Sequence, residues 1–182
     1  IDSFSRTAPS TLVVSDHSRK LTYAKLSFNG SNLANFLKNK GVKKGDRLAL
    51  IAYNCIEFSE IMYATSKLQA IFLPINFRLS SSEIIDIFKD SKPIYLIYQN
   101  HFSKIINDLI KNKKIDKSKC LSLNSEGVGN NSYNDIINDN TDDNNPFYKT
   151  NTNLDWSLMY TSGTTGKPKG VVRNQKSYFL MS

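Results

Sequence analysis

Short apolar runs alternate with longer amphipathic stretches along most of this chain. Four of the runs are predicted to be buried strands, and they cover residues 48–53, 71–75, 94–98 and 120–123. Stretches of helical length lie between them. Strands that are apolar throughout, alternating with helices, are typical of a mostly parallel sheet flanked by helices. The pattern therefore predicts an α/β fold.

Capping residues mark where the predicted helices begin. Thr22 is expected to cap a helix that ends near Lys40. Lys25 stands where a glutamate would complete the reciprocal capping box, so that half of the interaction is lost. Ser80 and Glu83 have the spacing of a full capping box and predict the start of a later helix.

The other expected elements are less regular. The second helix should bury a stripe made by Phe58, Ile61, Met62, Thr65 and Leu68. A short hairpin is predicted over residues 11–21 and a helix over 102–111. The segment 124–153 is rich in asparagine and aspartate and reads as a loop, with one helical turn at 133–137.

The segment TSGTTGKPKG, residues 161–170, contains no large apolar side chain. Glycines let a backbone approach an anion, and consecutive amides form a positively polarised nest. Hydroxyls and lysines add donors and positive charge. The apolar lead-in at 156–160 and the apolar return at 170–172 indicate a strand, a loop and a further extended segment. We therefore interpret it as a nucleotide-phosphate loop rather than as a surface turn that is merely rich in Gly and Thr.

Neither common phosphate-binding pattern fits this segment. The G-x-x-x-x-G-K-[ST] pattern fails because Pro168 follows Gly166 and Lys167, and because Thr161 stands where its first glycine belongs. A G-x-G-x-x-G fingerprint is also absent. The chain is thus expected to hold phosphate in a different way.

The sequence YTSGTTGKPKGVV, residues 160–172, resembles the signature loop of the adenylate-forming (AMP-binding) superfamily. This superfamily includes acyl-CoA synthetases, coumarate-CoA ligases, luciferases and peptide-synthetase adenylation domains. The upstream segments LTYAKL, GDRLAL and AIFLPINFRL resemble family segments in the same order. The resemblance implies that residues 1–182 are an incomplete N-terminal AMP-binding domain, with the phosphate loop at 160–172 and the C-terminal domain absent.

The resemblance also implies roles for individual residues. Lys169 would supply positive charge to the phosphate oxygens of ATP, and Thr161 would lie near a Mg²⁺ ion. Lys167 is expected to be a solvated side chain, at a position that varies within the family. The residues expected to cradle the β- and γ-phosphates are Ser162, Gly163, Thr164, Thr165 and Gly166.

The activity implied is that of an ATP-dependent acyl-CoA ligase of the fatty-acid or small-acid branch. Such an enzyme activates a carboxylic acid as an acyl-adenylate and transfers it to CoA. No catalytic residue is expected within the chain, because the family's remaining motifs would lie beyond Ser182, so these residues alone are expected to be inactive. Two alternatives stay open: an adenylation domain that loads a carrier protein, and a non-catalytic nucleotide-binding homologue.

Composition changes this picture little. The net charge of +8 comes from scattered lysines, and no aromatic-basic pattern accompanies it, so we do not expect nucleic-acid binding. The longest wholly apolar run is too short to span a bilayer. Cys55 and Cys120 show no metal or redox spacing and favour a reducing compartment, hence a cytoplasmic protein. His17 and His101 are expected at the surface.

Four further side chains carry expectations of their own. Tyr160 is expected to line the core, and Asp155 to cap or anchor the loop. Gln69 and Gln175 depart from the family pattern, since a glycine usually occupies the first position and a histidine often occupies the second. Arg78 is expected to make a structural contact rather than to bind a ligand.

Overall fold

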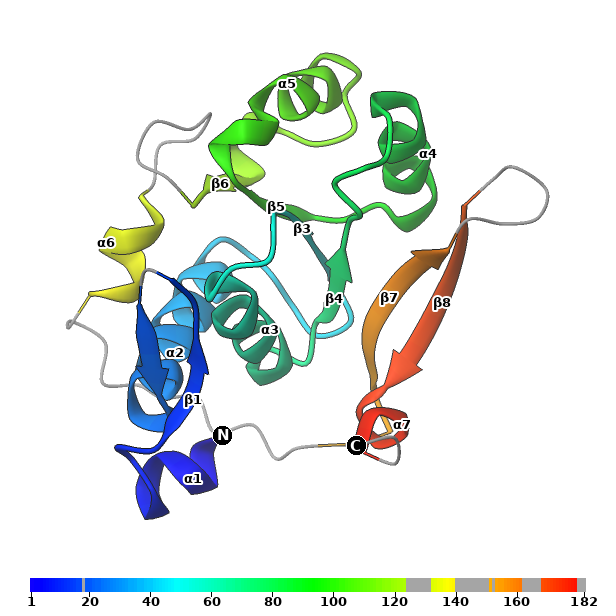
Figure 1. The fold of residues 1–182 in the computed structure, drawn as a ribbon. Coiled ribbons are helices and arrows are strands. Elements are labelled where there is room, and N and C mark those ends of the chain that lie inside the picture. The colour runs from blue at the N-terminus through cyan, green and yellow to red at the C-terminus, as the bar shows by residue number, and fades with distance from the viewer. Residues whose placement is uncertain (18, 124–131, 140–150, 152, 162–167, 180–182) are drawn as a thin grey trace.

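The computed structural model describes residues 1–17, 19–123, 132–139, 151, 153–161 and 168–179. Within these residues, the centre of the fold is a six-stranded sheet in the order β6-β5-β3-β4-β7-β8 (Figure 1). All neighbouring strands are parallel except β7 and β8, which form an antiparallel hairpin. The strands are β3 (Arg47–Ile51), β4 (Ile71–Pro74), β5 (Tyr95–Tyr98), β6 (Cys120–Ser122), β7 (Asp155–Thr161) and β8 (Lys169–Asn174).

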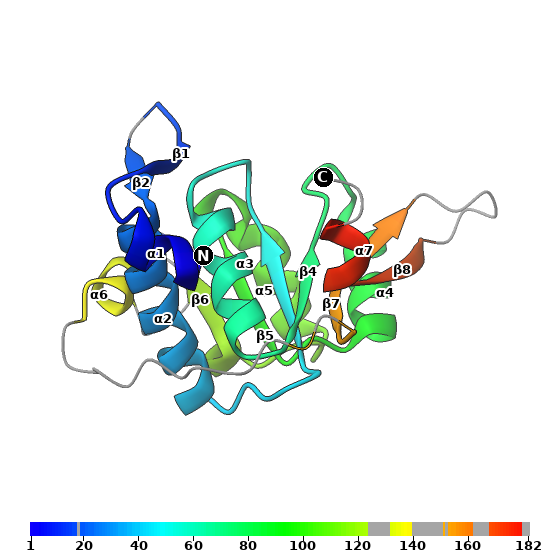
Figure 2. The same cartoon turned by 90° about the horizontal axis from the view of Figure 1, so that it is seen from below.

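Helices cover both faces of this sheet (Figure 2). On one face lie α2 (Tyr23–Asn39), α3 (Glu57–Lys67) and α6 (Tyr133–Ile137), and on the other lie α4 (Ser81–Ser91) and α5 (Ser103–Lys111). Strand β3 shows how one sequence serves both layers. Leu48 and Leu50 belong to the first core cluster, whereas Ala49 and Ile51 belong to the second. The predicted α/β fold with a mostly parallel, helix-flanked sheet is confirmed.

The strands are slightly shorter than the apolar runs that predicted them. Ala52, Ile75 and Leu123 follow the last paired residues of β3, β4 and β6, and all three are still buried. Ile75 and Leu123 still donate backbone hydrogen bonds to Leu50 and Tyr98 of the neighbouring strands, so the apolar pattern follows burial one residue past the strand bounds. Among the described residues, no helix is both long enough and apolar enough to cross a membrane.

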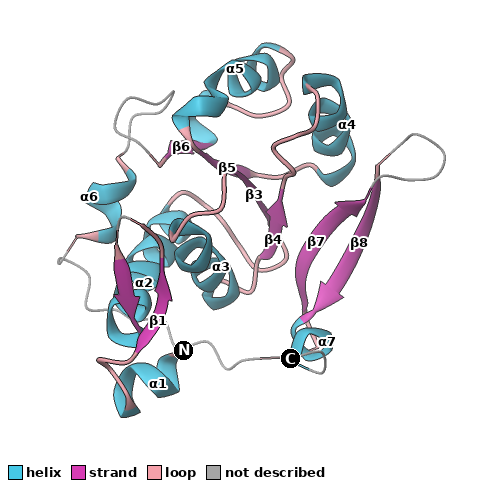
Figure 3. Ribbon diagram, viewed as in Figure 1, coloured by secondary structure: helices cyan, strands magenta, loops and turns pink. Residues whose placement is uncertain are grey.

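The smaller elements also follow the expected order (Figure 3). Strands β1 (Leu12–Ser15) and β2 (Lys20–Thr22) form the predicted hairpin, and α6 is the predicted single turn. Short 3₁₀ turns occur at Asn100–Phe102 and Lys117–Lys119, and α7 (Gln175–Phe179) follows β8. Helix α1 (Asp2–Thr7) was not predicted, because it buries no residue and so leaves no apolar stripe in the sequence.

Local geometry bears out the capping analysis. Thr22 accepts the backbone N–H of Lys25 at 3.3 Å, and both halves of the Ser80–Glu83 capping box are present. Gln69, which stands where the family usually has glycine, has φ of +53°, in the left-handed region that favours glycine. Gln69 thus places a side chain at a backbone conformation that is strained for residues other than glycine.

A buried carboxylate joins the layer of helices α2, α3 and α6. Glu60 of α3 is fully buried, and its oxygens accept hydrogen bonds from Asn29 Nδ2 at 2.6 Å and from the Tyr133 hydroxyl at 2.7 Å. Arg19, in the β1–β2 connection, lies 3.4 Å from the same carboxylate and 2.6 Å from Glu57. A charged side chain that is buried away from solvent is tolerated only when it is paired and hydrogen-bonded in this way.

The two cysteines are free thiols in different surroundings. Cys120 is buried in β6, and Cys55 is half-buried ahead of α3. Burial raises the pKa of each thiol to about 12, helped at Cys55 by its hydrogen bond with Glu57. Both groups therefore stay protonated near neutral pH, as expected of structural rather than reactive cysteines.

Replacing Tyr133 with Phe should lower the free energy of unfolding by about 2 kcal/mol, because the buried Glu60 carboxylate loses a hydrogen bond that nothing replaces. Burial and the neighbouring carboxylate raise the pKa of Tyr133, so its hydroxyl is a donor at every pH used for the comparison. Urea unfolding measures the loss. Tyr23→Phe is the matched control, since that ring stacks on Phe4 instead. Equal losses in the two variants would contradict the assignment.

At pH 8, the native thiols should react with a disulfide reagent such as DTNB at least about tenfold more slowly than free cysteine, whose pKa is about 8.5. Both should react rapidly once the protein is unfolded in urea. The absorbance of the thionitrobenzoate released from DTNB measures the rate of the reaction. If both thiols of the native protein react as fast as free cysteine, Cys55 and Cys120 are not buried and their pKa values are not raised.

Candidate nucleotide-binding site

The two described residues of the predicted nucleotide-binding set lie opposite each other. Thr161 ends β7, Lys169 begins β8, and they are direct partners in the antiparallel ladder. Directly opposite residues point to the same face of a hairpin, with Cβ atoms about 5 Å apart. Both residues are exposed. A hydroxyl and an ammonium group are thus presented side by side at the point where the chain enters and leaves the predicted loop.

The remaining predicted phosphate contacts lie outside the described residues, and their roles stay a prediction. They are Ser162, Gly163, Thr164, Thr165 and Gly166. Lys167, expected to be solvated, is also outside the described residues.

The hairpin has two different faces. Leu158 and Tyr160 pack against the core cluster that includes α4. Met159 and Val171 are directly opposite each other and are exposed on the other face. Because side chains alternate along a strand, Thr161 shares the face of Met159 rather than that of Tyr160. The Thr161–Lys169 pair therefore opens away from α4.

Tyr160 both packs and hydrogen-bonds. Its ring is half-buried, as expected for a residue lining the core, and its hydroxyl donates to Asp90 Oδ2 of α4. Burial and this bond together raise the pKa of Tyr160 to about 12. Tyr160 thus links the loop-proximal end of β7 to the helix beneath it.

The expectation for Asp155 is wrong. Asp155 begins β7 and pairs with Asn174, so it lies at the far end of the strand from Thr161, roughly 20 Å away at the usual rise per residue. That end is fixed by a different residue. Gln175, at the position that is often histidine in the family, donates from Nε2 to Ser66 Oγ of α3 at 2.6 Å.

The other singled-out side chains are at the surface. His17 and His101 are exposed, as expected, and Arg78 is exposed as well. The Arg78 guanidinium lies 5.5 Å from the Phe77 ring centroid, which makes it a stacking contact within the chain. Among the described residues, no three or more His, Cys, Asp or Glu side chains form a group that could hold a metal ion.

An aromatic cluster that sequence analysis missed lies at the carboxyl edge of the sheet, the edge at which Thr161 ends β7. Tyr53 follows β3, Phe77 follows β4, and His101 and Phe102 follow β5. The Tyr53 ring centroid is 4.8 Å from that of Phe77, 5.3 Å from that of His101 and 5.0 Å from that of Phe102. The strand order reverses between β3 and β5, where α/β sheets usually bind ligands. The four residues are far apart in sequence, so no local pattern marks them.

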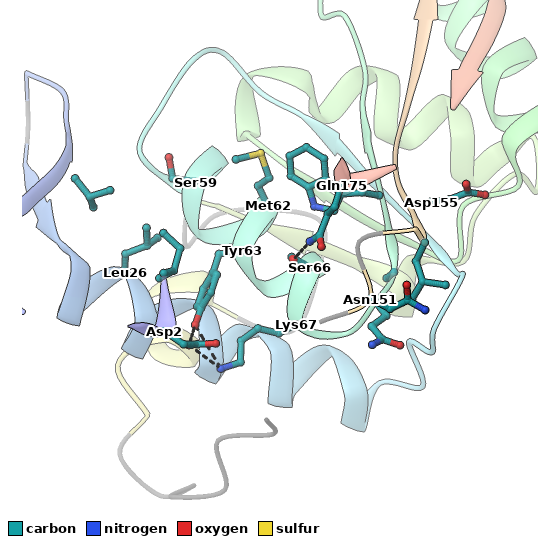
Figure 4. Close-up of a pocket in the computed structure, with 16 residues that line it drawn as sticks. Asp2, Leu26, Ser59, Met62, Tyr63, Ser66, Lys67, Asn151, Asp155 and Gln175 are labelled. Atoms are coloured by element: carbon teal, nitrogen blue, oxygen red, sulfur yellow. Dashed lines mark hydrogen bonds and ion pairs between the residues drawn. The ribbon is translucent and has the colours of Figure 1, made fainter. Parts of the chain in front are cut away.

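A pocket of about 500 Å³ lies at the opposite, amino-terminal ends of β4 and β7 (Figure 4). Lys67 is almost fully buried there, with Nζ 3.6 Å from Asp2 Oδ1 and 3.1 Å from Ser31 Oγ. The Tyr63 hydroxyl also donates to Asp2, and burial lowers the pKa of Lys67. The length of β7 separates this pocket from the Thr161–Lys169 pair. Its other lining residues include Leu26, Met62, Ser66, Trp156 and Gln175.

Comparison with known proteins shows the family to which the chain belongs. Residues 2–181 match the AMP-binding enzyme family. The long-chain-fatty-acid–CoA ligase FadD13 of Mycobacterium tuberculosis is 33% identical over 158 residues, which cover 87% of this chain and 30% of the ligase. The fatty acid–[acyl-carrier-protein] ligase ScoC of Streptomyces coeruleorubidus is 28% identical, over 95% of this chain and 32% of that protein.

A solved structure shows the same fold. The inhibitor-bound N-terminal domain of FACL13 from Mycobacterium tuberculosis superposes with a TM-score of 0.83 and 27% identity, over 98% of this chain and 44% of that one. The chain therefore belongs to the AMP-binding enzyme family, and it has the fold of an N-terminal domain of adenylate-forming enzymes. It spans about a third of the length of the curated relatives that it matches.

Proposed function

We propose that this chain is the N-terminal part of a longer ATP-dependent ligase that joins a carboxylic acid to the thiol of CoA through an acyl-adenylate. The observation that carries the proposal is the pairing of Thr161 with Lys169, side by side and exposed, at the base of the loop that resembles the family signature. Because the chain covers about a third of its relatives, their activity is assigned here only as a proposal.

The reaction has two steps with one physical difficulty. A carboxylate oxygen attacks the α-phosphorus of ATP, and the bond to the leaving pyrophosphate breaks; the thiol then attacks the acyl carbon and AMP leaves. The first step brings one anion onto another. Positive charge and amide donors fixed at the phosphates therefore lower its barrier more than proton transfer does.

The proposed roles follow from this difficulty. The Lys169 ammonium offsets charge on the β- and γ-phosphates, and the backbone and hydroxyls of Ser162, Gly163, Thr164, Thr165 and Gly166 wrap the same groups. Mg²⁺ would be held near the Thr161 hydroxyl and would supply further positive charge to the phosphate oxygens. An exposed hydroxyl beside an ammonium fits a hard, oxygen-rich ligand of this kind. Further ligands for Mg²⁺ would come from ATP or from outside the described residues.

The acceptor thiol has two candidates, because the relatives include both a CoA ligase and a ligase named for an acyl-carrier protein. We favour CoA, and a carrier protein is the second candidate. A non-catalytic nucleotide-binding homologue is the third. We also propose a cytoplasmic location, since two free thiols fit a reducing compartment.

In the full-length protein, pyrophosphate release should depend on ATP and on one class within a panel of carboxylic acids. Replacing Lys169 with Ala should lower kcat/KM for ATP by about 10²- to 10³-fold, the usual effect of losing one group that stabilises transition-state charge. Lys176→Ala, an exposed lysine in α7, is the matched control and should leave the rate unchanged.

Two results would contradict the proposal. An unchanged rate in the Lys169→Ala variant would remove the role given to this lysine. Wild-type protein that binds ATP but releases no pyrophosphate with any acid would favour the non-catalytic homologue. Product analysis with CoA and with a carrier protein decides between the two acceptors.

A further inference from the structure

The hairpin that carries the predicted phosphate loop is weakly joined to the sheet through its backbone. Strands β3 and β4 share four register pairs, as do β3 and β5, whereas β4 and β7 share one, Phe72 with Ser157. The four residues of β7 beyond Ser157 therefore extend past this pair. In Figure 1 this half of the hairpin stands apart from β4 and lies toward α4. Side chains must then contribute to fixing where the loop begins.

Tyr160 makes such a contact from the loop-proximal half of β7. Its hydroxyl donates to Asp90 Oδ2, and Asp90 is the second-last residue of α4. A carboxylate near the C-terminus of a helix faces the negative end of the helix dipole, which is unfavourable. A hydrogen bond from Tyr160 compensates for that position. The bond spans 70 residues of sequence and joins two elements that no backbone pair connects.

Gly170 leaves room for the Tyr160 ring. The two residues are direct cross-strand partners, one step before the Thr161–Lys169 pair. A Cβ atom at position 170 would lie 3.2 Å from Tyr160 Cζ and 2.9 Å from Leu158 Cδ1, both closer than ordinary van der Waals contact. The Tyr160 ring thus lies against the backbone of β8 on the α4 side. Its direction toward Asp90 depends on the absence of a side chain at Gly170.

We propose that Tyr160, Asp90 and Gly170 form a positioning site that fixes the mouth of the phosphate loop against α4. Tyr160 and Asp90 do not touch the nucleotide in this account. They act through Thr161, the next residue in β7, and through Lys169, the residue before Gly170. The inference rests on the proposed nucleotide-binding role of that pair, and it assigns a function to residues other than those expected to contact phosphate.

The test compares Tyr160→Phe and Asp90→Asn in the full-length protein. Tyr160→Phe removes the donor of the hydrogen bond, and Asp90→Asn replaces its charged acceptor with a neutral amide; both keep the shape of the side chain. Asp86→Asn is the matched control, because Asp86 lies on the same helix and forms an ion pair with Lys89 at 2.7 Å. KM for ATP should rise about three- to tenfold in both test variants, the factor expected for one net hydrogen bond. KM for the carboxylic acid should not change, and the double variant should be no worse than either single one.

A second readout does not need activity. Amide hydrogen exchange at residues 158–161 and 169–171 should be faster in the two test variants, with exchange elsewhere in the sheet unchanged. An unchanged KM for ATP together with unchanged exchange in the hairpin would overturn the proposal. A uniform rise in exchange, with both KM values altered alike, would also overturn it, because it would show a general loss of stability.

The two readouts also separate this inference from the function on which it rests. If the wild-type protein releases no pyrophosphate, the ligase assignment fails while exchange still shows whether Tyr160 and Asp90 fix the hairpin. Should Tyr160→Phe not fold, the exposed Asp90→Asn variant gives the same comparison.

Discussion

The antiparallel pairing of β8 with β7 is the interaction on which the candidate site depends. Every other neighbouring pair in the central sheet is parallel, so the chain elsewhere leaves the carboxyl edge through a helix. Here it turns back directly, and Thr161 and Lys169 become cross-strand partners. A parallel connection would separate the two side chains by a crossover. The β7–β8 hairpin therefore brings the Thr161 hydroxyl and the Lys169 ammonium group together on one face.

Anchoring such a hairpin places demands on the rest of the domain. Its two ends reach different layers, since Tyr160 bonds to Asp90 of α4 and Gln175 bonds to Ser66 of α3. Within the layer that contains α3, the buried Glu60 carboxylate joins α3 to α2 and α6. Polar contacts between elements thus set the orientation of a segment that shares one register pair with β4. The apolar clusters supply the rigid body to which these contacts attach.

Much of the fold was predictable because it is encoded locally. Apolar runs located the parallel strands, and Thr22 and Ser80 marked helix starts that the structure confirms. The signature loop identified the family. The Glu60 network, the aromatic cluster beside Tyr53 and the Tyr160–Asp90 bond were missed, because each joins residues that only the tertiary fold brings together. Asp155 was misassigned for a related reason: proximity to the loop in sequence was taken for proximity in space, although an extended strand separates the two.

The most direct test of the central claim is a crystal structure of the full-length protein with Mg²⁺ and a non-hydrolysable ATP analogue. We expect β- or γ-phosphate oxygens within about 3 Å of Lys169 Nζ, and the Thr161 hydroxyl on the same side of the hairpin, directed toward the metal ion. Phosphates bound instead in the pocket beside Lys67, or at the aromatic cluster around Tyr53 with Lys169 free in solvent, would contradict it.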